Sequence, residues 1–416
     1  MFDDSGYERP LRRRGRGNVL THTLVGFLGA GLAAALILIF YSPSGGVSLP
    51  GSGAVPAPAA SAPPLPRGEQ ALAAKVKPGL VIVNTTLQYN SEAAAGTGMV
   101  LNADGLVLTN NHVIDGSTKI TATVASTGQT YPAMVVGYDK TGDVALIQLQ
   151  HASGLTTVPI GNSSSVKPGQ AVVALGNAGG QGSITATAGH VTALNQTITA
   201  SNDAGSTASE TLHGMIQTNA DIVPGDSGGP LASSAGVIGI DTAGDNANDQ
   251  QQAATGFAIP INTALSVARQ IAGGHASSTI TIGYPAFVGI FIGSGSSRDP
   301  QAQARQQEQQ NGGPGGTGGT PACSRNNADL GVPSAIAPAG SGTLVIGTIC
   351  GSPAASAGMT GGAVITAVNG KAVGSPDDLA SILSRFHPGD TISVTWVSPS
   401  GQRTTRSLHL AAGPPQ

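Results

Sequence analysis

Short apolar runs recur along the middle of the chain, between Leu80 and Ala272, and are separated by Gly, Asn, Asp and Pro. The runs show almost no helical periodicity. Many short strands at such spacing predict a mainly β domain, a barrel or a sandwich of about 190 residues. The expected strands are 80–86, 98–102, 105–111, 119–124, 133–139, 144–149, 171–175, 189–195, 236–242 and 256–260. A helix over 261–274 is expected to close this domain.

The pattern before this domain predicts one membrane-spanning helix. Residues 24–41, "LVGFLGAGLAAALILIFY", contain neither charge nor proline, and the apolar stretch reaches back to Leu20. About twenty such residues cross a hydrocarbon core. Arginines in residues 9–16 are expected to keep the tail 1–19 in the cytoplasm, so the chain after a span over 20–41 lies outside. The alternative is a cleaved signal peptide, but the apolar core is long for one.

Two polar segments mark the domain boundaries. Residues 42–68 are rich in Pro, Ala, Gly and Ser and predict an extended linker. The β domain then covers 69–275 and begins with a short helix. A second domain is expected over 280–412, and its Gln- and Gly-rich residues 294–327 predict a disordered insertion.

The second domain has a compact α+β pattern. Strands are expected at 343–349, 363–370 and 391–397. A helix is expected between the last two strands. Ser375 is suited to be its N-cap and Pro376 its first helical residue, and the two acidic residues that follow are favourable in a first helical turn.

Composition narrows the classes of partner and compartment. The net charge of −3 argues against nucleic acid as the main partner, because such binding needs a basic face. Nothing in the sequence indicates a cofactor or a metal site.

Cys323 and Cys350 both lie on the outer side of the expected span, where an oxidising compartment allows a disulfide. Abundant Ala and Gly with few lysines are typical of a G+C-rich bacterium, such as an actinobacterium.

The stretch "GDSGGP", residues 225–230, is the candidate catalytic motif. A serine hydroxyl is a poor nucleophile at neutral pH, so Ser227 needs a histidine as base and a carboxylate to orient that histidine. The glycines allow a sharp turn in which the N–H groups of Gly225 and Ser227 form an oxyanion hole, and the N–H of Asp226 is expected as a further donor.

The best base and acid both precede this serine. His112 ends the apolar strand of "GLVLTNNHVI", whereas His151, His190 and His213 stand among polar residues and are expected in loops. Asp143 heads the apolar strand of "DKTGDVALIQL", and Asp139 before it is expected to be a turn residue.

These three motifs, in the order His, Asp, Ser, resemble the trypsin-like serine peptidases and in particular the HtrA (DegP/DegQ-like) family. The resemblance covers residue 69 to the C-terminus and includes "GTGMVLN" and "ALGN". It implies a chymotrypsin-like double β-barrel with the site between the barrels. It also implies His112 as general base, Asp143 as its orienter and Ser227 as nucleophile.

Two aspartates near the serine depart from the HtrA pattern. The family usually has Asn at the position of Asp226, and Asp221 stands where trypsin-type enzymes keep the acid that selects basic P1 side chains. HtrA enzymes favour small apolar P1 residues. We therefore expect a small or aliphatic P1 residue, with Asp221 turned away from it.

Residues 284–293, "YPAFVGIFIG", resemble the carboxylate-binding loop and first strand of a PDZ domain of the HtrA type. The resemblance implies that Phe287, Val288, Gly289 and Ile290 bind the terminal carboxylate of an extended peptide, opposite the helix 376–386. The family usually has Asp at the position of Ala363. A packing module without a ligand is the alternative.

Taken together, the motifs predict a single-pass membrane protein of the cell envelope. Its extracytoplasmic domain would be a serine endopeptidase that cleaves misfolded or regulatory proteins, with a PDZ domain that binds peptides; homo-oligomers are compatible with this. The alternative is a non-enzymatic PDZ binding protein or holdase chaperone on a peptidase scaffold. An esterase is disfavoured, because α/β-hydrolases place the acid and base after the serine.

Overall fold

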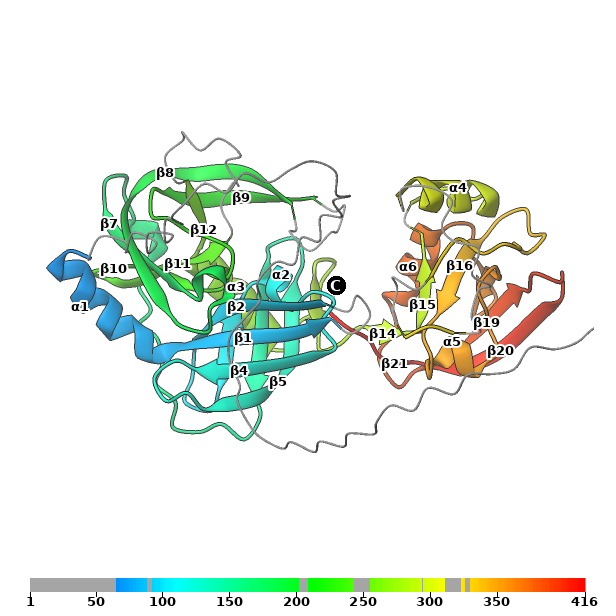
Figure 1. The fold of residues 1–416 in the computed structure, drawn as a ribbon, viewed down its shortest axis with the longest axis horizontal. Helices are drawn as coiled ribbons and strands as arrows, with labels where there is room; N and C mark the ends of the chain where they lie inside the picture. Colours follow the sequence, from blue (N-terminus) through cyan, green and yellow to red (C-terminus); the bar gives the residue numbers. More distant parts are fainter. Residues whose placement is uncertain are drawn as a thin grey trace, which may run out of the picture. The chain divides into compact units, whose positions relative to one another are not determined.

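The computed structural model describes residues 65–87, 92–201, 209–242, 255–293, 295–310, 323–325 and 330–415 (Figure 1). The predicted span 20–41 and nearly all of the predicted linker 42–68 lie outside this part of the chain. Among the described residues, no helix is both long and apolar enough to cross a membrane.

The first β-barrel contains the elements that carry the predicted base and acid. Its strands follow the order β5-β4-β1-β2-β3-β6, and β5 also pairs with β6, which closes the sheet. A helical turn, α2 (Asn111–Ile114), follows β3. The six strands are β1 (Leu80–Leu87), β2 (Glu92–Val100), β3 (Leu106–Thr109), β4 (Lys119–Val124), β5 (Thr130–Asp139) and β6 (Val144–Leu149).

The second barrel contains the predicted nucleophile between two of its strands. It is closed in the order β10-β11-β12-β9-β8-β7 (Figure 1). Its strands are β7 (Ala171–Gly176), β8 (Thr185–Ser201), β9 (Ser209–Thr218), β10 (Pro230–Ser233), β11 (Gly236–Thr242) and β12 (Gly256–Pro260). One apolar cluster includes buried residues of both barrels, which ties them together around the site.

Helices before and after the strands of the two barrels pack on this core. Helix α1 (Arg67–Val76) and the 3-10 turn η1 (Lys77–Gly79) precede β1, as the sequence predicted. Helix α3 (Ile261–Ala272) follows β12 and buries Ile261, Ala264, Ala268 and Ile271 on one face. The chain then adds β13 (Ile280–Ile282) beside β5, so these residues belong to the first barrel's sheet and the second domain begins later than predicted.

The second domain is a small α+β unit. Its main sheet has the order β15-β16-β17-β19-β20, and β18 pairs with β17. The helices are α4 (Pro300–Gln310), α5 (Pro353–Ser356) and α6 (Pro376–Leu383). Its strands are β14 (Ala286–Phe287), β15 (Ile290–Ile292), β16 (Thr343–Thr348), β17 (Val364–Val368), β18 (Lys371–Ala372), β19 (Thr391–Val397), β20 (Arg403–His409) and β21 (Ala411–Ala412).

The helix start at Ser375 is as predicted, since its side chain accepts a hydrogen bond from the Asp378 N–H. The predicted disorder over 294–327 is wrong for α4. There the buried Gln303 side chain donates to Gly342 O and accepts from Leu344 N–H, which joins the helix to the start of β16.

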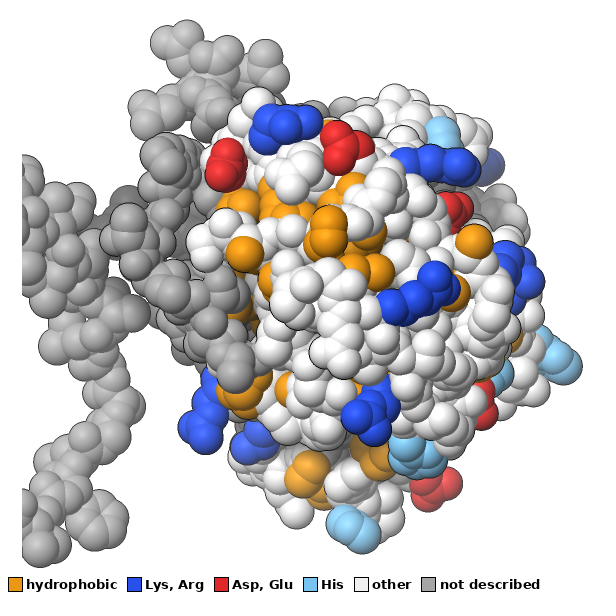
Figure 2. All heavy atoms as spheres, turned by 90° about the vertical axis from the view of Figure 1, so that its right-hand side faces the viewer, with side chains coloured by type: hydrophobic (Ala, Val, Ile, Leu, Met, Phe, Trp, Pro, Cys, Tyr) orange, Lys and Arg blue, Asp and Glu red, His pale blue; other side chains and the backbone are white. Residues whose placement is uncertain are grey.

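Strands β9, β10 and β20 were not predicted. Their sequences alternate poorly, and pairing with neighbouring strands decides their conformation. His190 lies on β8, within the predicted strand 189–195, and His213 lies on the unpredicted β9, so neither histidine stands in a loop. Lys and Arg side chains are scattered singly over the face shown in Figure 2, among uncharged and hydrophobic ones.

Candidate active site

His112 and Asp143 are brought together by the first barrel. His112 lies on α2, and Asp143 stands directly before β6 with a φ of 50°. The His112 Nδ1 atom lies 2.9 Å from Asp143 Oδ2 and 3.0 Å from Oδ1, and the His112 backbone N–H donates to Oδ1. Because an ionised carboxylate only accepts hydrogen bonds, Nδ1 carries the proton and Nε2 is left as the basic atom.

Further donors hold the Asp143 carboxylate and its backbone. The Thr242 hydroxyl at the end of β11 donates to Oδ2 at 3.1 Å, across the two barrels. The buried Asn110 amide donates to the Asp143 carbonyl. Asp139 shapes the preceding turn, as predicted, by accepting from the Gly142 N–H. Asp143 is 1% exposed, so its orientation is fixed from several sides.

Ser227 lies in the turn between β9 and β10 and is 4% exposed. Its carbonyl accepts from the Thr97 N–H of β2, and the Thr97 hydroxyl donates to the Gly225 carbonyl. Gly228 has a φ of 84° and packs so closely on Thr97 O and Thr109 Oγ1 that a Cβ atom has no room. Since Thr109 precedes His112 by one short turn, this packing brings the serine loop to the base.

The turn leaves two donors for an oxyanion. Among the described residues, no acceptor binds the N–H of Gly225 or Ser227. Gly225 adopts a φ of 96° against the Asn177 carbonyl, a conformation that needs glycine. The Asp226 N–H, by contrast, donates to the Val223 carbonyl. Asp226 is therefore not an open donor, which differs from the expectation for this residue.

The two unusual aspartates have different surroundings. Asp221 is exposed, and its carbonyl accepts from the Thr187 hydroxyl. Asp226 is 4% exposed, and burial raises the pKa of its carboxyl to about 6. A third carboxyl, Asp241, is completely buried at the end of β11, and burial raises its pKa well above 3.8.

The predicted peptide loop lies at the exposed edge of the second domain's sheet. Phe287 belongs to β14, Val288 is buried in the core, and Ile290 begins the edge strand β15. Gly289, with a φ of 79°, packs against Ser352. Its carbonyl accepts from the Ser352 hydroxyl and from the Ile349 N–H.

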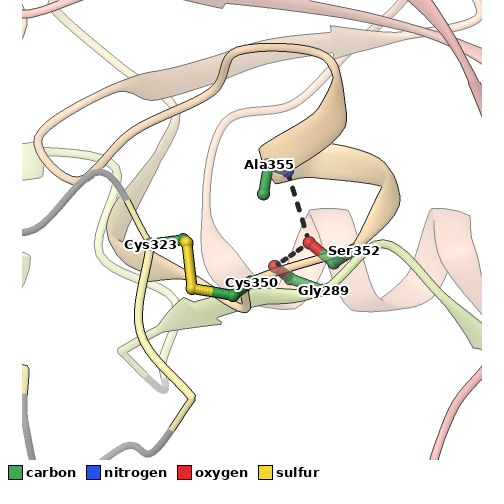
Figure 3. The surroundings of a disulfide bond; sticks show 5 residues. All are labelled: Gly289, Cys323, Cys350, Ser352 and Ala355. Carbon is green, nitrogen blue, oxygen red and sulfur yellow. Dashed lines mark hydrogen bonds between the residues drawn. A yellow bond between two sulfur atoms is a disulfide. The ribbon is translucent and has the colours of Figure 1, made fainter.

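A disulfide lies behind this loop. Cys323 and Cys350 are bonded, and their Cα atoms are 4.9 Å apart (Figure 3). Cys350 directly follows Ile349, and its N–H donates to the Ser324 carbonyl. The bond therefore ties the inserted segment to the residues that hold Gly289.

Sequence reasoning missed Thr97, Asn110, Thr242 and Asp241. The "DT" pair that ends the apolar run "GVIGI" carried a usable signal, because two polar residues closing a buried strand need partners. Thr97 and Asn110 lay inside the quoted motifs without an assigned role.

Known proteins share both domains. Residues 96–240 match the trypsin-like peptidase domain family, and residues 346–397 match the PDZ domain family. The chain is 31% identical over 398 residues to the serine protease PepD of Mycobacterium tuberculosis, which covers 91% of this chain and 74% of PepD.

Other relatives match shorter parts of the chain. A probable periplasmic serine protease do/HhoA-like of Haemophilus influenzae is 33% identical, over 73% of this chain and 55% of its own length. The periplasmic serine endoprotease DegP of Escherichia coli is 38% identical, over 44% of this chain and 37% of its own length. The solved HtrA-type protease AlgW with a tripeptide covers 84% of this chain and 98% of its own, with 24% identity and a TM-score of 0.43.

The domain matches define a trypsin-like serine endopeptidase with a C-terminal PDZ domain. With PepD as a relative over most of both chains, the chain belongs to the HtrA family of serine proteases. The predicted class of enzyme is thereby confirmed.

Proposed function

We propose that the chain cleaves misfolded or regulatory proteins of the cell envelope through an acyl-enzyme on Ser227. The observation that supports this most is the orientation of His112 by Asp143, which accepts from the imidazole, from the His112 N–H and from Thr242. A base oriented in this way removes the serine proton as the hydroxyl attacks a carbonyl, and later protonates the leaving amine.

The oxyanion is stabilised by the N–H groups of Gly225 and Ser227 in this proposal. Both are held in place before substrate arrives, because Thr97 binds the carbonyls of the same two residues. Such preorganised donors lower the energy of the tetrahedral intermediate without a rearrangement during the reaction. Asp226 is left out of the oxyanion hole, because its N–H already has an acceptor.

The preference for small or aliphatic P1 residues remains our proposal. It is supported by the exposed position of Asp221, where water screens the charge. A peptide library that varies only P1 tests it: cleavage after Val should exceed cleavage after Arg. Comparable rates after both residues would remove the preference.

The PDZ domain is proposed to bind the C-terminus of a substrate or activating peptide. The edge strand β15 can add such a peptide by strand pairing, and the half-buried Ile290 and Ile292 pack on the same core as Leu383 and Phe386 near the end of α6. Phe287, Val288, Gly289 and Ile290 would receive the carboxylate. Ala363 is buried in this core, so an apolar residue suits its position.

We also propose a single-pass anchor over 20–41 and a catalytic domain outside the cytoplasm. Support comes from the uncharged apolar stretch, the arginines before it and the two cysteines after it. A high-G+C bacterial source, such as an actinobacterium, agrees with the composition and with the mycobacterial relative.

The catalytic assignment is tested by labelling the full-length chain with a fluorophosphonate probe. Wild type should label, whereas Ser227→Ala and His112→Ala should not. Unfolded casein and C-terminal peptides are added in parallel, because a resting enzyme can be inactive until it binds a peptide. Labelling of wild type that never exceeds Ser227→Ala under any condition would instead favour the holdase alternative.

A further inference from the structure

Two buried carboxyl groups lie beside the proposed nucleophile and have no part in the proposed chemistry. Asp226 precedes Ser227 and is 4% exposed, and Asp241 on β11 is fully buried. Their backbones hold the serine loop: the Gly228 N–H donates to Asp241 O, and the Gly229 N–H donates to Asp226 O. The Asp241 N–H in turn donates to Gly229 O at 2.7 Å. A change in either carboxyl therefore acts directly on this loop.

The carboxyl oxygens are poorly supplied with donors. Asp226 Oδ2 accepts from the Val223 N–H at 3.0 Å. Asp226 Oδ1 and both oxygens of Asp241 are buried and have no hydrogen-bond partner among the described residues. An ionised carboxylate in this state would cost several kcal/mol, of order the desolvation penalty of a buried charge.

Both groups approach the same end of β7. Asp226 Oδ1 lies against Gly176, where a Cβ atom would overlap it. The Leu175 N–H lies near enough to the Asp241 carboxyl to lower its pKa, but it reaches hydrogen-bonding geometry with neither oxygen. The two carboxyls thus share one small region of the barrel.

No positive charge compensates them. Among the described residues, no ion pair includes Asp226 or Asp241. The charged groups near them are themselves acidic. Asp221, in the same loop, raises the pKa of Asp226, and Asp226 raises the pKa of Asp241. On β12 the residue paired with Asp241 is Ala258, and on β7 the residue that acts on the Asp241 carboxyl is Leu175. Both side chains are uncharged.

We propose that Asp226 and Asp241 are positioning residues that hold one proton between them, and that this shared proton keeps the Ser227 loop in its reactive shape. At neutral pH the proton lies on Asp241, whose O–H donates to the Asp226 carboxylate. This supplies one of the missing donors and removes one of two repelling charges. The proposal rests on Ser227 being the nucleophile.

Loss of the proton at alkaline pH has a defined consequence. Two carboxylates without enough donors would face each other behind Gly225 and Ser227, and their charge would oppose the developing oxyanion. We expect kcat to fall at alkaline pH, with little change in KM. An asparagine at Asp241 carries a permanent N–H donor and no charge, so it should replace the protonated carboxyl.

The test compares Asp241→Leu, Asp241→Asn and wild type in the full-length chain. Asp241→Leu, which lacks a donor, should lower kcat by about tenfold or more, the rate equivalent of one buried hydrogen bond. Asp241→Asn should restore most of this loss and abolish the alkaline fall. Wild-type kcat and pH profile in Asp241→Leu would overturn the positioning role.

An infrared difference spectrum detects the proton itself. Wild type at neutral pH should show the C=O band of a protonated carboxyl, and Asp241→Asn should lack it. Absence of this band in wild type overturns the shared proton. If the band is present but no form labels with the fluorophosphonate, the proposed function and the positioning role fail, while the shared proton stands.

Discussion

At the scale of single residues, the catalytic geometry depends on small polar side chains that cross between elements. Thr242 belongs to the second barrel but binds the carboxylate of Asp143 in the first. Thr97 from the first barrel binds the loop of Ser227 in the second. Each of these hydrogen bonds therefore fixes one proposed catalytic residue against the other barrel.

Thr242 is predicted to be a positioning residue for His112. Thr242→Val keeps the shape but removes the donor to Asp143, so kcat should fall by about tenfold. Thr242→Ser keeps the hydroxyl and should restore most of the activity. Steady-state kinetics of the two variants decide this, and equal kcat values for Val and Ser would contradict it.

Gly228 is predicted to tolerate no side chain. Gly169 has nearly the same φ, 83° against 84°, but nothing lies within 4 Å of its absent Cβ. Gly169→Ala should therefore cost only the backbone strain, about 1–2 kcal/mol. Gly228→Ala adds overlap with Thr97 and Thr109 and should cost clearly more. Urea denaturation of both variants measures their free energies of unfolding. Equal losses of stability would show that the loop rearranges to accommodate the added Cβ atom.

The buried Asp241 also makes stability depend on pH. Its pKa is raised in the folded protein, so the folded state binds the proton more tightly than the unfolded state does. The stability that the protonated Asp241 contributes is fully present at a pH below the ordinary pKa of 3.8. It is lost as the pH rises to and through the raised pKa of the folded state. The difference in melting temperature between Asp241→Asn and wild type should therefore favour the variant more at pH 8 than at pH 4.

At the scale of elements, the inserted segment is part of the PDZ fold rather than an appendage. Helix α4 supplies Gln303, whose side chain bonds Ser297 O, Gly342 O and Leu344 N–H. Ala304 of the same helix belongs to an apolar cluster with Leu344 and Ile346 of β16. The helix thus satisfies backbone groups at the start of a central strand.

Replacement of Gln303 by Leu should destabilise the PDZ domain by about 2 kcal/mol, because it leaves buried backbone groups without partners. Gln306 is exposed on the same helix, so Gln306→Leu is the matched control and should change little. Thermal unfolding of the two variants measures this. Equal melting temperatures would mean that α4 does not support β16.

The disulfide is expected to support the same domain. It closes a loop of 27 residues, for which chain entropy predicts about 3 kcal/mol. Reduction should lower the melting temperature and weaken peptide binding, because Cys350 adjoins the Ile349 N–H that holds Gly289. A variant with Cys323→Ser and Cys350→Ser should be insensitive to reductant, and wild type that behaves likewise would contradict this.

At the scale of the whole molecule, the proposed function needs an anchor before the peptidase and a peptide reader after it. The full-length chain should remain in the membrane fraction after an alkaline wash, and deletion of 20–41 should release it. N-terminal sequencing separates the alternatives. A mature chain that begins beyond residue 41 would show a cleaved signal peptide instead.

The sequence by itself determined the class of fold, most strands of both barrels and the proposed triad. Apolar runs are local, and His112, Asp143 and Ser227 each stand in a recognisable local context. It also located the two cysteines that are bonded in the structure.

Only the tertiary structure decided which polar residues support the site. Thr97, Thr242 and Asp241 come from distant strands, and their partners depend on barrel closure rather than on local pattern. The same holds for α4. Its polar sequence predicted disorder, whereas in the folded chain Gln303 forms hydrogen bonds with backbone groups at the start of β16. Asp226 shows the limit most clearly, because its role depends on Asp241, a residue that lies beside it only in the folded chain.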